Sequence, residues 1–138
     1  MRLVLDTNTV VSGFLWQNAP RRVIEAAIEG RIELTTSAAL IEELTGVLGR
    51  AKFSRKIAEH GVSISALVDR YAKLARLITP ALIGRVVSDP DDDKVLACAL
   101  AAEADLIVSG DKRVRNLKTY HGIRIVNVTG ALALIPKP

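Results

Sequence analysis

Acidic side chains that could share a divalent cation lie at four separate places in this 138-residue sequence. Sites built from carboxylate oxygens, without cysteine or histidine, suit hard cations such as Mg²⁺ or Mn²⁺ rather than zinc. Cations of this kind support the hydrolysis of phosphate esters. The four places are Asp6, Glu43, the segment 89–93 and Asp111.

Two of these acids follow short apolar runs that are typical of buried parallel strands. Asp6 ends the segment 2–6, and Asp111 stands two residues after the segment 106–109. The carboxyl ends of parallel strands lie at one edge of a sheet, so the two carboxylates should converge there. The alternative role for each is structural, because aspartate also caps turns and helices. Polar residues that could support this edge are Thr7, Asn8 and Ser109.

The segment 89–93 (Asp-Pro-Asp-Asp-Asp) concentrates four carboxylates at a predicted helix start. Asp89 suits the N-cap and Pro90 the first helical position, and acids in the first turn stabilise the helix dipole. Capping needs fewer than four acids, and a bound cation would relieve their mutual repulsion. Asp92 and Asp93 both flank the apolar face of this helix, so periodicity leaves both open as ligands.

Glu43 lies on a predicted helix over 38–50, which Ser37 caps. Its neighbour Glu42 points almost opposite Leu44, which belongs to the apolar stripe, so Glu42 is expected to face solvent. Glu43 lies at the border of the stripe. From there it could reach inward over the sheet edge or form an ordinary ion pair.

The remaining pattern predicts the elements that would position these side chains. Short apolar runs alternate with amphipathic stretches, which favours a mainly parallel sheet with helices on both faces. We therefore expect an α/β fold, a three-layer α/β/α sandwich with about five strands, as one domain over residues 1–138. The expected strands are 2–6, 31–35, 75–79, 106–109 and 123–128, and the expected helices are about 20–29, 38–50, 63–75 and 90–103, with a short helical turn after 129.

Basic residues outnumber acidic ones, and the formal net charge is +4. This excess weakly favours an anionic partner such as nucleic acid. The basic residues cluster within 50–56 and 112–118, although solvated helix faces explain such clusters equally well. Candidates for contacts with phosphate groups are Lys52, Arg55, Lys56, Arg113 and Arg115.

Several other kinds of site are not expected from the sequence. The single cysteine, Cys98, cannot form an internal disulfide, which favours a reducing, cytoplasmic compartment and a buried thiol. His60 and His121 lack the spacing of zinc ligands and should lie on the surface. No glycine-rich phosphate loop and no Gly-x-Ser-x-Gly elbow occurs. We also expect no signal peptide and no membrane segment.

Four short motifs occur in order along residues 2–128. They are Leu-Asp-Thr-Asn at 5–8, Ile-Glu-Glu-Leu at 41–44, Asp-Pro-Asp-Asp-Asp-Lys-Val-Leu-Ala-Cys-Ala at 89–99 and Val-Ser-Gly-Asp at 108–111. Together they resemble the PIN-domain ribonucleases, most closely the toxin components of prokaryotic toxin–antitoxin systems, which include the VapC-type toxins. Each motif alone is weak, and the combination is specific.

The resemblance implies a catalytic and metal-binding set that holds Mg²⁺ or Mn²⁺, namely Asp6, Glu43, Asp93 and Asp111. Asp93 is preferred within the acidic run because Asp93-x-x-Leu96-Ala97 matches the family's Asp-x-x-Ile-Ala helix. Asp92 is the rival for that position. The implied supporting residues are Thr7, Asn8, Asp92 and Ser109.

The activity implied by the resemblance is that of an endoribonuclease with RNA as substrate. The protein would then be a toxin that pairs with a cognate antitoxin, and a homodimer with Trp16 and Phe14 near its interface is a further expectation. Alternatives are a PIN-like binding module without activity and a related metal-dependent DNA nuclease. A phosphoacceptor receiver domain fits less well, because the leading aspartate directly follows the first strand, and the receiver pattern of an aspartate after a middle strand with a lysine after a late one does not appear.

Overall fold

The computed structural model describes residues 1–87 and 89–138, and a six-stranded sheet lies at its centre. The strands are β1 (Arg2–Leu5), β2 (Glu33–Thr36), β3 (Arg76–Leu77), β4 (Leu106–Val108), β5 (Thr119–Tyr120) and β6 (Ile123–Val126). Their order is β3-β2-β1-β4-β6-β5, and all neighbours pair in parallel except β5 with β6. The central pair, β1 and β4, is therefore flanked by further strands on both sides.

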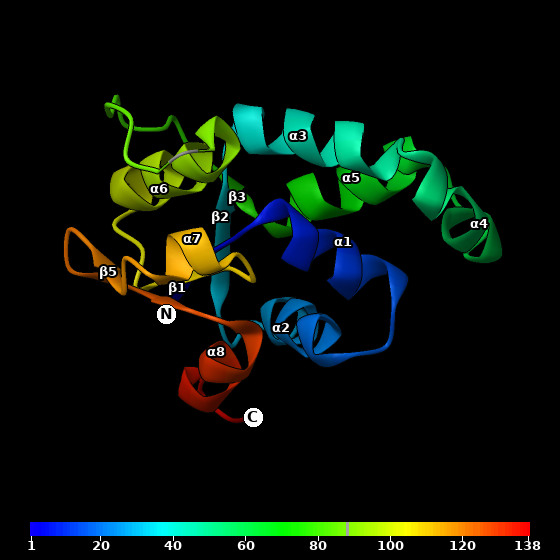
Figure 1. Ribbon diagram of the computed structural model, residues 1–138. Helices are drawn as coiled ribbons and strands as arrows, with labels where there is room; N and C mark the ends of the chain where they lie inside the picture. The colour runs from blue at the N-terminus through cyan, green and yellow to red at the C-terminus, as the bar shows by residue number, and fades with distance from the viewer. Residues whose placement is uncertain (88) are drawn as a thin grey trace.

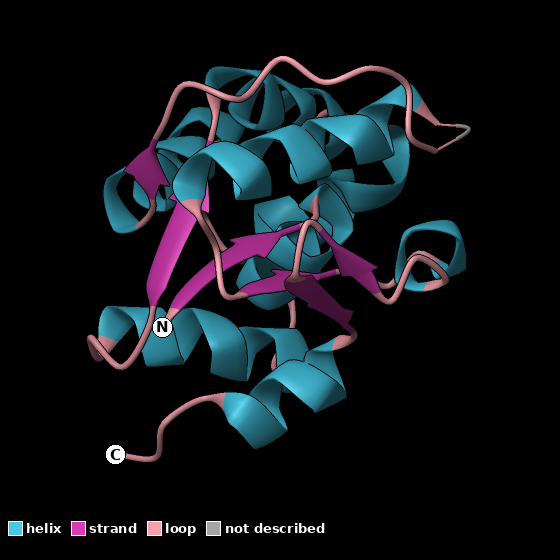
Figure 2. Cartoon of the chain, turned by 90° about the vertical axis from the view of Figure 1, so that its left-hand side faces the viewer, coloured by secondary structure: helices cyan, strands magenta, loops and turns pink. Residues whose placement is uncertain are grey.

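Helices cover both faces of the sheet. They are α1 (Thr7–Leu15), α2 (Ala19–Ile28), α3 (Ala38–Leu48), α4 (Ala51–Glu59), α5 (Ile64–Leu74), α6 (Pro90–Ala102), α7 (Lys112–Arg115) and α8 (Val128–Leu134). α3, α5 and α6 lie on one side, and α2 and α8 lie on the other (Figure 1). Figure 2 shows the strands between these helical layers, which confirms the three-layer α/β/α sandwich.

The sheet has six strands rather than the five expected, because β5 forms a short hairpin with β6. Tyr120 pairs with Ile123 across a two-residue turn, in which His121 and Gly122 have φ values of 49° and 80°. Positive φ at both positions matches the right-handed twist of a hairpin, and glycine adopts it without strain. A two-residue strand carries too little periodicity to be recognised in the sequence.

Helix α1 is not expected from the sequence. Its residues include threonine, valine, serine and glycine, which have low intrinsic helix propensity. The side chain of Asp6 caps the helix by accepting a hydrogen bond of 2.9 Å from the amide of Thr9. Val10, Val11 and Leu15 are buried in the core. Burial of this apolar face therefore outweighs the weak local preference.

The alternation of side chains along β1 divides the core between the two sides of the sheet. Leu3 and Leu5 belong to one apolar cluster, whereas Val4 belongs to a second cluster with Leu96 and Cys98 of α6. Cys98 is fully buried, as expected, and burial raises the pKa of its thiol to about 12. The thiol is therefore unreactive at neutral pH.

Most other expected elements are confirmed to within a few residues. Helix α6 begins at Pro90 with Asp89 as its N-cap. The strand expected over 75–79 is shorter, Arg76–Leu77, and the chain leaves the sheet before Pro80, which has no N–H to donate. None of the helices in the described part of the chain is long and apolar enough to traverse a membrane.

The contact between α1 and α2 depends on Gly13. A Cβ atom added there would lie 2.7 Å from Cγ1 of Ile24 and 3.0 Å from the carbonyl oxygen of Pro20. Gly13→Ala should therefore push the two helices apart and lower the free energy of unfolding by about 1–3 kcal/mol. Gly46→Ala in α3 is the matched control, because a Cβ there meets nothing within 4 Å.

Thermal or urea unfolding of both variants checks this prediction. The control should be neutral or more stable, because alanine favours a helix by about 1 kcal/mol over glycine. The same change in stability in Gly13→Ala as in Gly46→Ala would show that the added Cβ atom is accommodated between α1 and α2 at no cost.

Candidate active site

Asp6 lies where the two central strands of the sheet end side by side. Leu5 of β1 pairs with Val108 of β4, and the amide of Asp6 donates to the carbonyl of Val108 at 3.0 Å. The Oδ2 atom of Asp6 accepts hydrogen bonds from Oγ of Ser109 at 2.8 Å and from the amide of Gly110 at 3.1 Å. Because β2 and β6 extend the sheet in opposite directions, this edge is the point at which ligands bind in open α/β sheets.

Asp111 joins Asp6 through Ser109, so the predicted convergence of these two acids is confirmed. The Oγ atom of Ser109 donates to Asp6 and accepts from the amide of Asp111 at 3.1 Å. Asp111 also caps α7 by accepting from the amide of Arg113 at 2.8 Å. An open cleft of about 430 Å³ adjoins both acids, and it is lined by Asp6, Asn8, Thr9, Ser12, Pro20, Gly110, Asp111 and Val128.

Asp92 is the member of the acidic run that reaches Asp111. The Nη2 atom of Arg113 lies 2.8 Å from Oδ2 of Asp111 and 3.7 Å from Oδ2 of Asp92, so both carboxyl groups lie beside one guanidinium, and the side chain of Asp92 is only 15% exposed. Burial and the neighbouring charges of Asp111 and Asp89 raise the pKa of Asp92 to about 6. The hydrogen bond from the Arg113 side chain holds the pKa of Asp111 below its ordinary value. As pH falls, Asp92 is therefore protonated before Asp111 is.

Asp93 is placed differently from what the family motif implies. Its Oδ1 atom accepts from the amide of Val87 at 3.0 Å, and both its oxygens lie 3.3 Å from the amide of Val86. These bonds hold the segment before α6 against the first turn of the helix. Asp93 thus stabilises the loop before α6, and Asp92, its predicted rival as a ligand, is the acid that lies beside Asp111.

Glu43 approaches the same edge from α3. Its side chain approaches Thr7, which is buried at the start of α1. Burial is the main cause that raises the pKa of Glu43, and the charges of Asp91 and Asp6 add to it. Glu43 therefore lies within electrostatic reach of Asp6, and the supporting role of Thr7 stays a prediction. Glu42 is exposed, also as expected.

A second shallow hollow of about 500 Å³ lies between α3 and α6 beside Glu43. Asp91 and Lys94 face it and form an ion pair of 2.8 Å, three residues apart on α6. The sequence pattern places Asp91 in the acidic first turn of the helix but does not predict its pairing with Lys94. The spacing of three residues is the one signal that could have predicted their ion pair.

Two carboxylate oxygens in this region are buried without a hydrogen-bond partner, Oε2 of Glu43 and Oδ2 of Asp92. Unpaired buried acceptors are costly, and a divalent cation would satisfy them. As the described side chains stand, no three acidic, histidine or cysteine groups meet closely enough to hold one ion. The donor set nevertheless fits a hard cation in its chemistry, because the acids that follow β1 and β4 and those on α3 and α6 offer only oxygen atoms.

The raised pKa of Asp92 has a consequence for stability. Between about pH 4 and pH 6 the folded metal-free protein keeps the Asp92 proton that the unfolded chain has lost, so this group lowers the free energy of unfolding as pH rises. Asp92→Asn removes the effect. We therefore expect the variant to gain stability relative to wild type from pH 4 to pH 7.

Urea unfolding in EDTA at several pH values measures that difference. The depressed pKa of Asp111 acts below pH 4 and does not interfere with this window. A difference in stability that stays constant from pH 4 to pH 7 would contradict the assignment of the proton to Asp92.

Comparison with known proteins identifies the fold family. A family model described as PIN domain matches residues 2–113, most of the chain. The chain belongs to the PIN domain family. PIN domains are generally nucleases, and they typically use divalent metals. The match spans every residue predicted for the site of this PIN domain. None of the curated proteins compared with the chain matches it.

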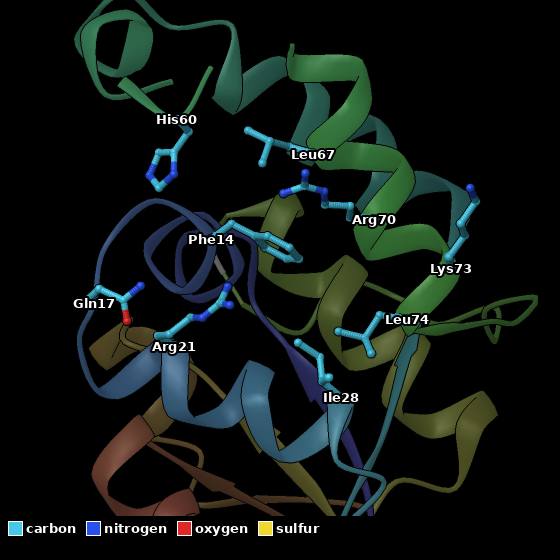
Figure 3. Close-up of a pocket in the computed structure, with 9 residues that line it drawn as sticks. All are labelled: Phe14, Gln17, Arg21, Ile28, His60, Leu67, Arg70, Lys73 and Leu74. Carbon is cyan, nitrogen blue, oxygen red and sulfur yellow. The ribbon is translucent and has the colours of Figure 1, made fainter. Parts of the chain in front are cut away.

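The PIN domain has a further cleft of about 600 Å³ outside the acidic edge, between α1, α2 and α5 (Figure 3). Apolar side chains and basic side chains line it together. The lining residues are Phe14, Gln17, Arg21, Ile28, His60, Leu67, Arg70, Lys73 and Leu74. His60 is exposed at this cleft, and its Nε2 lies 2.9 Å from the carbonyl of Leu15. His121 is exposed as well, so the histidines lie on the surface as expected.

Proposed function

We propose that this PIN domain is an endoribonuclease that depends on Mg²⁺ or Mn²⁺ and hydrolyses phosphodiester bonds of RNA. The observation that carries the proposal is the hydrogen-bonded link from Asp6 through Ser109 to Asp111 at the carboxyl edge of the sheet, with Asp92 beside the same Arg113 guanidinium as Asp111. Membership in a family of nucleases supports the same reaction class.

Asp6, Asp92, Asp111 and Glu43 would hold the cation. When bound, it would activate water for attack on the phosphodiester and stabilise the negative charge that develops. Ser109 and the amide of Gly110 orient the carboxylate of Asp6, and Thr7 would orient Glu43, which it adjoins. Asp92 must release its proton before it can bind the cation, so cation binding should strengthen as pH rises through about 6.

The two basic clusters do not lie equally close to these acids. Helix α4, which carries Lys52, Arg55 and Lys56, lies at the far end of the molecule from α7 (Figure 1). Lys52 and Lys56 stack over the rings of Phe53 and Trp16. Arg115 lies next to the site, with Nη2 3.4 Å from the carbonyl of Gly110. We propose that Arg115, which lies beside the acidic site, contacts the phosphate backbone of bound RNA.

Cleavage assays on matched RNA and DNA oligonucleotides, with Mg²⁺, Mn²⁺ or EDTA, test the proposal. We expect RNA cleavage that requires the metal and falls at least tenfold in Glu43→Gln. Glu42→Gln is the control, because Glu42 is the exposed neighbour on the same helix. Cleavage of DNA alone would indicate the related DNA nuclease. Absence of cleavage by the wild type would indicate a binding module and overturn the proposal.

We further propose that the enzyme is a toxin restrained by a cognate antitoxin, and that the antitoxin binds the cleft of Figure 3. The exposed side chains of Arg70 and Lys73 have no ion-pair partner among the residues that the structure describes, and Ile28 is 61% exposed beside them. An acidic amphipathic segment would complement this combination of charge and apolar surface. The homodimer stays a prediction.

Growth of a host that expresses the chain measures the toxin role. Expression should arrest growth, and coexpression of an adjacent small open reading frame should restore it. Arg70→Glu with Lys73→Glu should abolish the restoration without abolishing the arrest. Normal growth with wild-type protein at verified expression would contradict the toxin role.

A further inference from the structure

The guanidinium group of Arg113 lies among three carboxylates of the candidate site. Its Nη2 atom is 2.8 Å from Oδ2 of Asp111, 3.5 Å from Oδ2 of Asp89 and 3.7 Å from Oδ2 of Asp92. Its Nε atom donates to Oδ1 of Asp111 at 3.2 Å, so the contact with Asp111 is bidentate. The guanidinium of Arg113 thus links the start of α6 to the start of α7.

Arg113 and a divalent ion need the same oxygen atoms. The guanidinium takes up acceptor positions on both oxygens of Asp111, and its positive charge repels a divalent ion. A Mg²⁺ ion, which binds its oxygen ligands at about 2.0–2.1 Å, should therefore bind this carboxylate less well while Arg113 is in place. The Oδ2 atom of Asp92 is buried and lies beyond hydrogen-bond distance of Arg113. The guanidinium therefore offsets the charge of this acid without satisfying it, and a smaller, more highly charged ion would satisfy it better.

The geometry of α7 allows the Arg113 side chain to leave without unfolding the helix. The backbone amide of Arg113 is held separately, by Oδ1 of Asp111 at 2.8 Å. The side chain itself is 55% exposed. Rotation of the side chain into solvent would therefore free the carboxylates while the backbone of α7 stays in place.

We propose that Arg113 is an internal counter-cation that occupies the acidic site in the metal-free protein and is displaced when a divalent ion binds. This inference rests on the metal site of the proposed function. Arg113 acts on the reaction indirectly: it is a positioning residue that sets the concentration of metal at which the site fills. Removing the guanidinium should strengthen metal binding, and it should also remove the ion pairs that link α6 to α7.

Two controls separate competition for the same oxygens from a general effect of positive charge. Arg113→Lys keeps the charge but cannot form the bidentate contact with Asp111. Lys112→Gln removes one charge from the same helix turn, at an exposed residue for which no ion pair is found within 1–87 and 89–138. A long-range effect would depend on the charge alone and would be screened by salt.

Calorimetric titration with Mn²⁺ at pH 7 tests the proposal on the full chain. We expect Arg113→Gln to bind about tenfold more tightly than wild type, with Arg113→Lys in between and Lys112→Gln within about threefold. Equal affinities of Arg113→Gln and Lys112→Gln would overturn the inference and leave the metal site intact. No binding by either wild type or Arg113→Gln would overturn the metal site itself.

A second measurement uses the wild-type protein and does not depend on the folding of a variant. The Nε–H group of Arg113, bonded to Asp111, should give a resolved signal in a ¹H–¹⁵N spectrum of the metal-free protein. Saturation with Mg²⁺ should shift this signal or broaden it by exchange with water. An unchanged signal at saturation, with metal binding verified by calorimetry, would overturn the displacement.

Discussion

Asp92→Asn should reduce metal-dependent RNA cleavage by about 100-fold or more while the protein stays folded. Asp92 lies with Asp111 beside the Arg113 guanidinium, and its buried Oδ2 atom has no hydrogen-bond partner. Asparagine keeps the volume of the side chain but presents no second anionic oxygen to a cation. A bound metal contributes several kcal/mol to the stabilisation of a phosphoryl transition state, and each 1.4 kcal/mol, roughly, is tenfold in rate.

Asp93→Asn should lower the stability of the protein but leave RNA cleavage nearly unchanged. The carboxylate of Asp93 accepts from the amides of Val86 and Val87, and asparagine can replace only one of its two acceptor oxygens. We expect the free energy of unfolding to fall by about 1 kcal/mol, with cleavage within about threefold of wild type at a temperature where the variant is folded. Metal titration should show weakened binding for Asp92→Asn alone.

Cleavage rates, Mn²⁺ affinity and thermal unfolding of the two variants decide between these assignments. The two substitutions are chemically identical and one residue apart, so each variant serves as the control for the other. Loss of cleavage in Asp93→Asn, with cleavage retained in Asp92→Asn, would restore the assignment implied by the family motif and contradict the geometry.

The second large effect is expected at Asp6. Its carboxylate accepts from three donors, which are the hydroxyl of Ser109 at 2.8 Å and the amides of Gly110 at 3.1 Å and Thr9 at 2.9 Å. In Asp6→Asn, an NH₂ group replaces one of the two acceptor oxygens, so it faces hydrogen-bond donors with which it cannot pair. We expect cleavage to fall by about 100-fold or more, because the central ligand is lost, and the free energy of unfolding to fall by about 1–3 kcal/mol.

Ser109→Ala separates the two consequences of the Asp6 substitution. It keeps the carboxylate of Asp6 but removes the hydroxyl that links it to Asp111. We expect metal affinity to fall by about 10–100-fold, as for other residues that orient a metal ligand, with less loss of stability than in Asp6→Asn. Circular dichroism and thermal unfolding establish that both variants are folded. Wild-type cleavage by folded Asp6→Asn would rule out its role as a ligand.

Local chemistry in the sequence predicts much of the molecule. Apolar runs that alternate with amphipathic stretches predict the parallel sheet, and the rule that strand ends share one edge brings Asp6 and Asp111 together. Capping preferences locate the starts of α3 and α6, where Ser37 and Asp89 accept from backbone amides. These features depend on neighbours within a few residues, so they can be recognised without the fold.

Other features depend on contacts between distant segments. Helix α1 forms against its intrinsic propensity because the core buries its apolar face. The positions of Asp92 and Asp93 differ by one residue in the first turn of α6, where both flank the apolar face. The segment before the helix takes the carboxylate of Asp93, which leaves Asp92 to face Asp111. The periodicity of the α6 sequence cannot predict where the segment before the helix packs.

The sequence by itself determined the sheet, the edge at which the acids gather and the oxygen chemistry of the candidate site, because side-chain type and spacing specify these properties locally. Only the tertiary structure decided which acid of the run joins that site and that Arg113 offsets its charge. The physical reason is that hydrogen bonds and ion pairs between separate elements choose among residues that are locally equivalent.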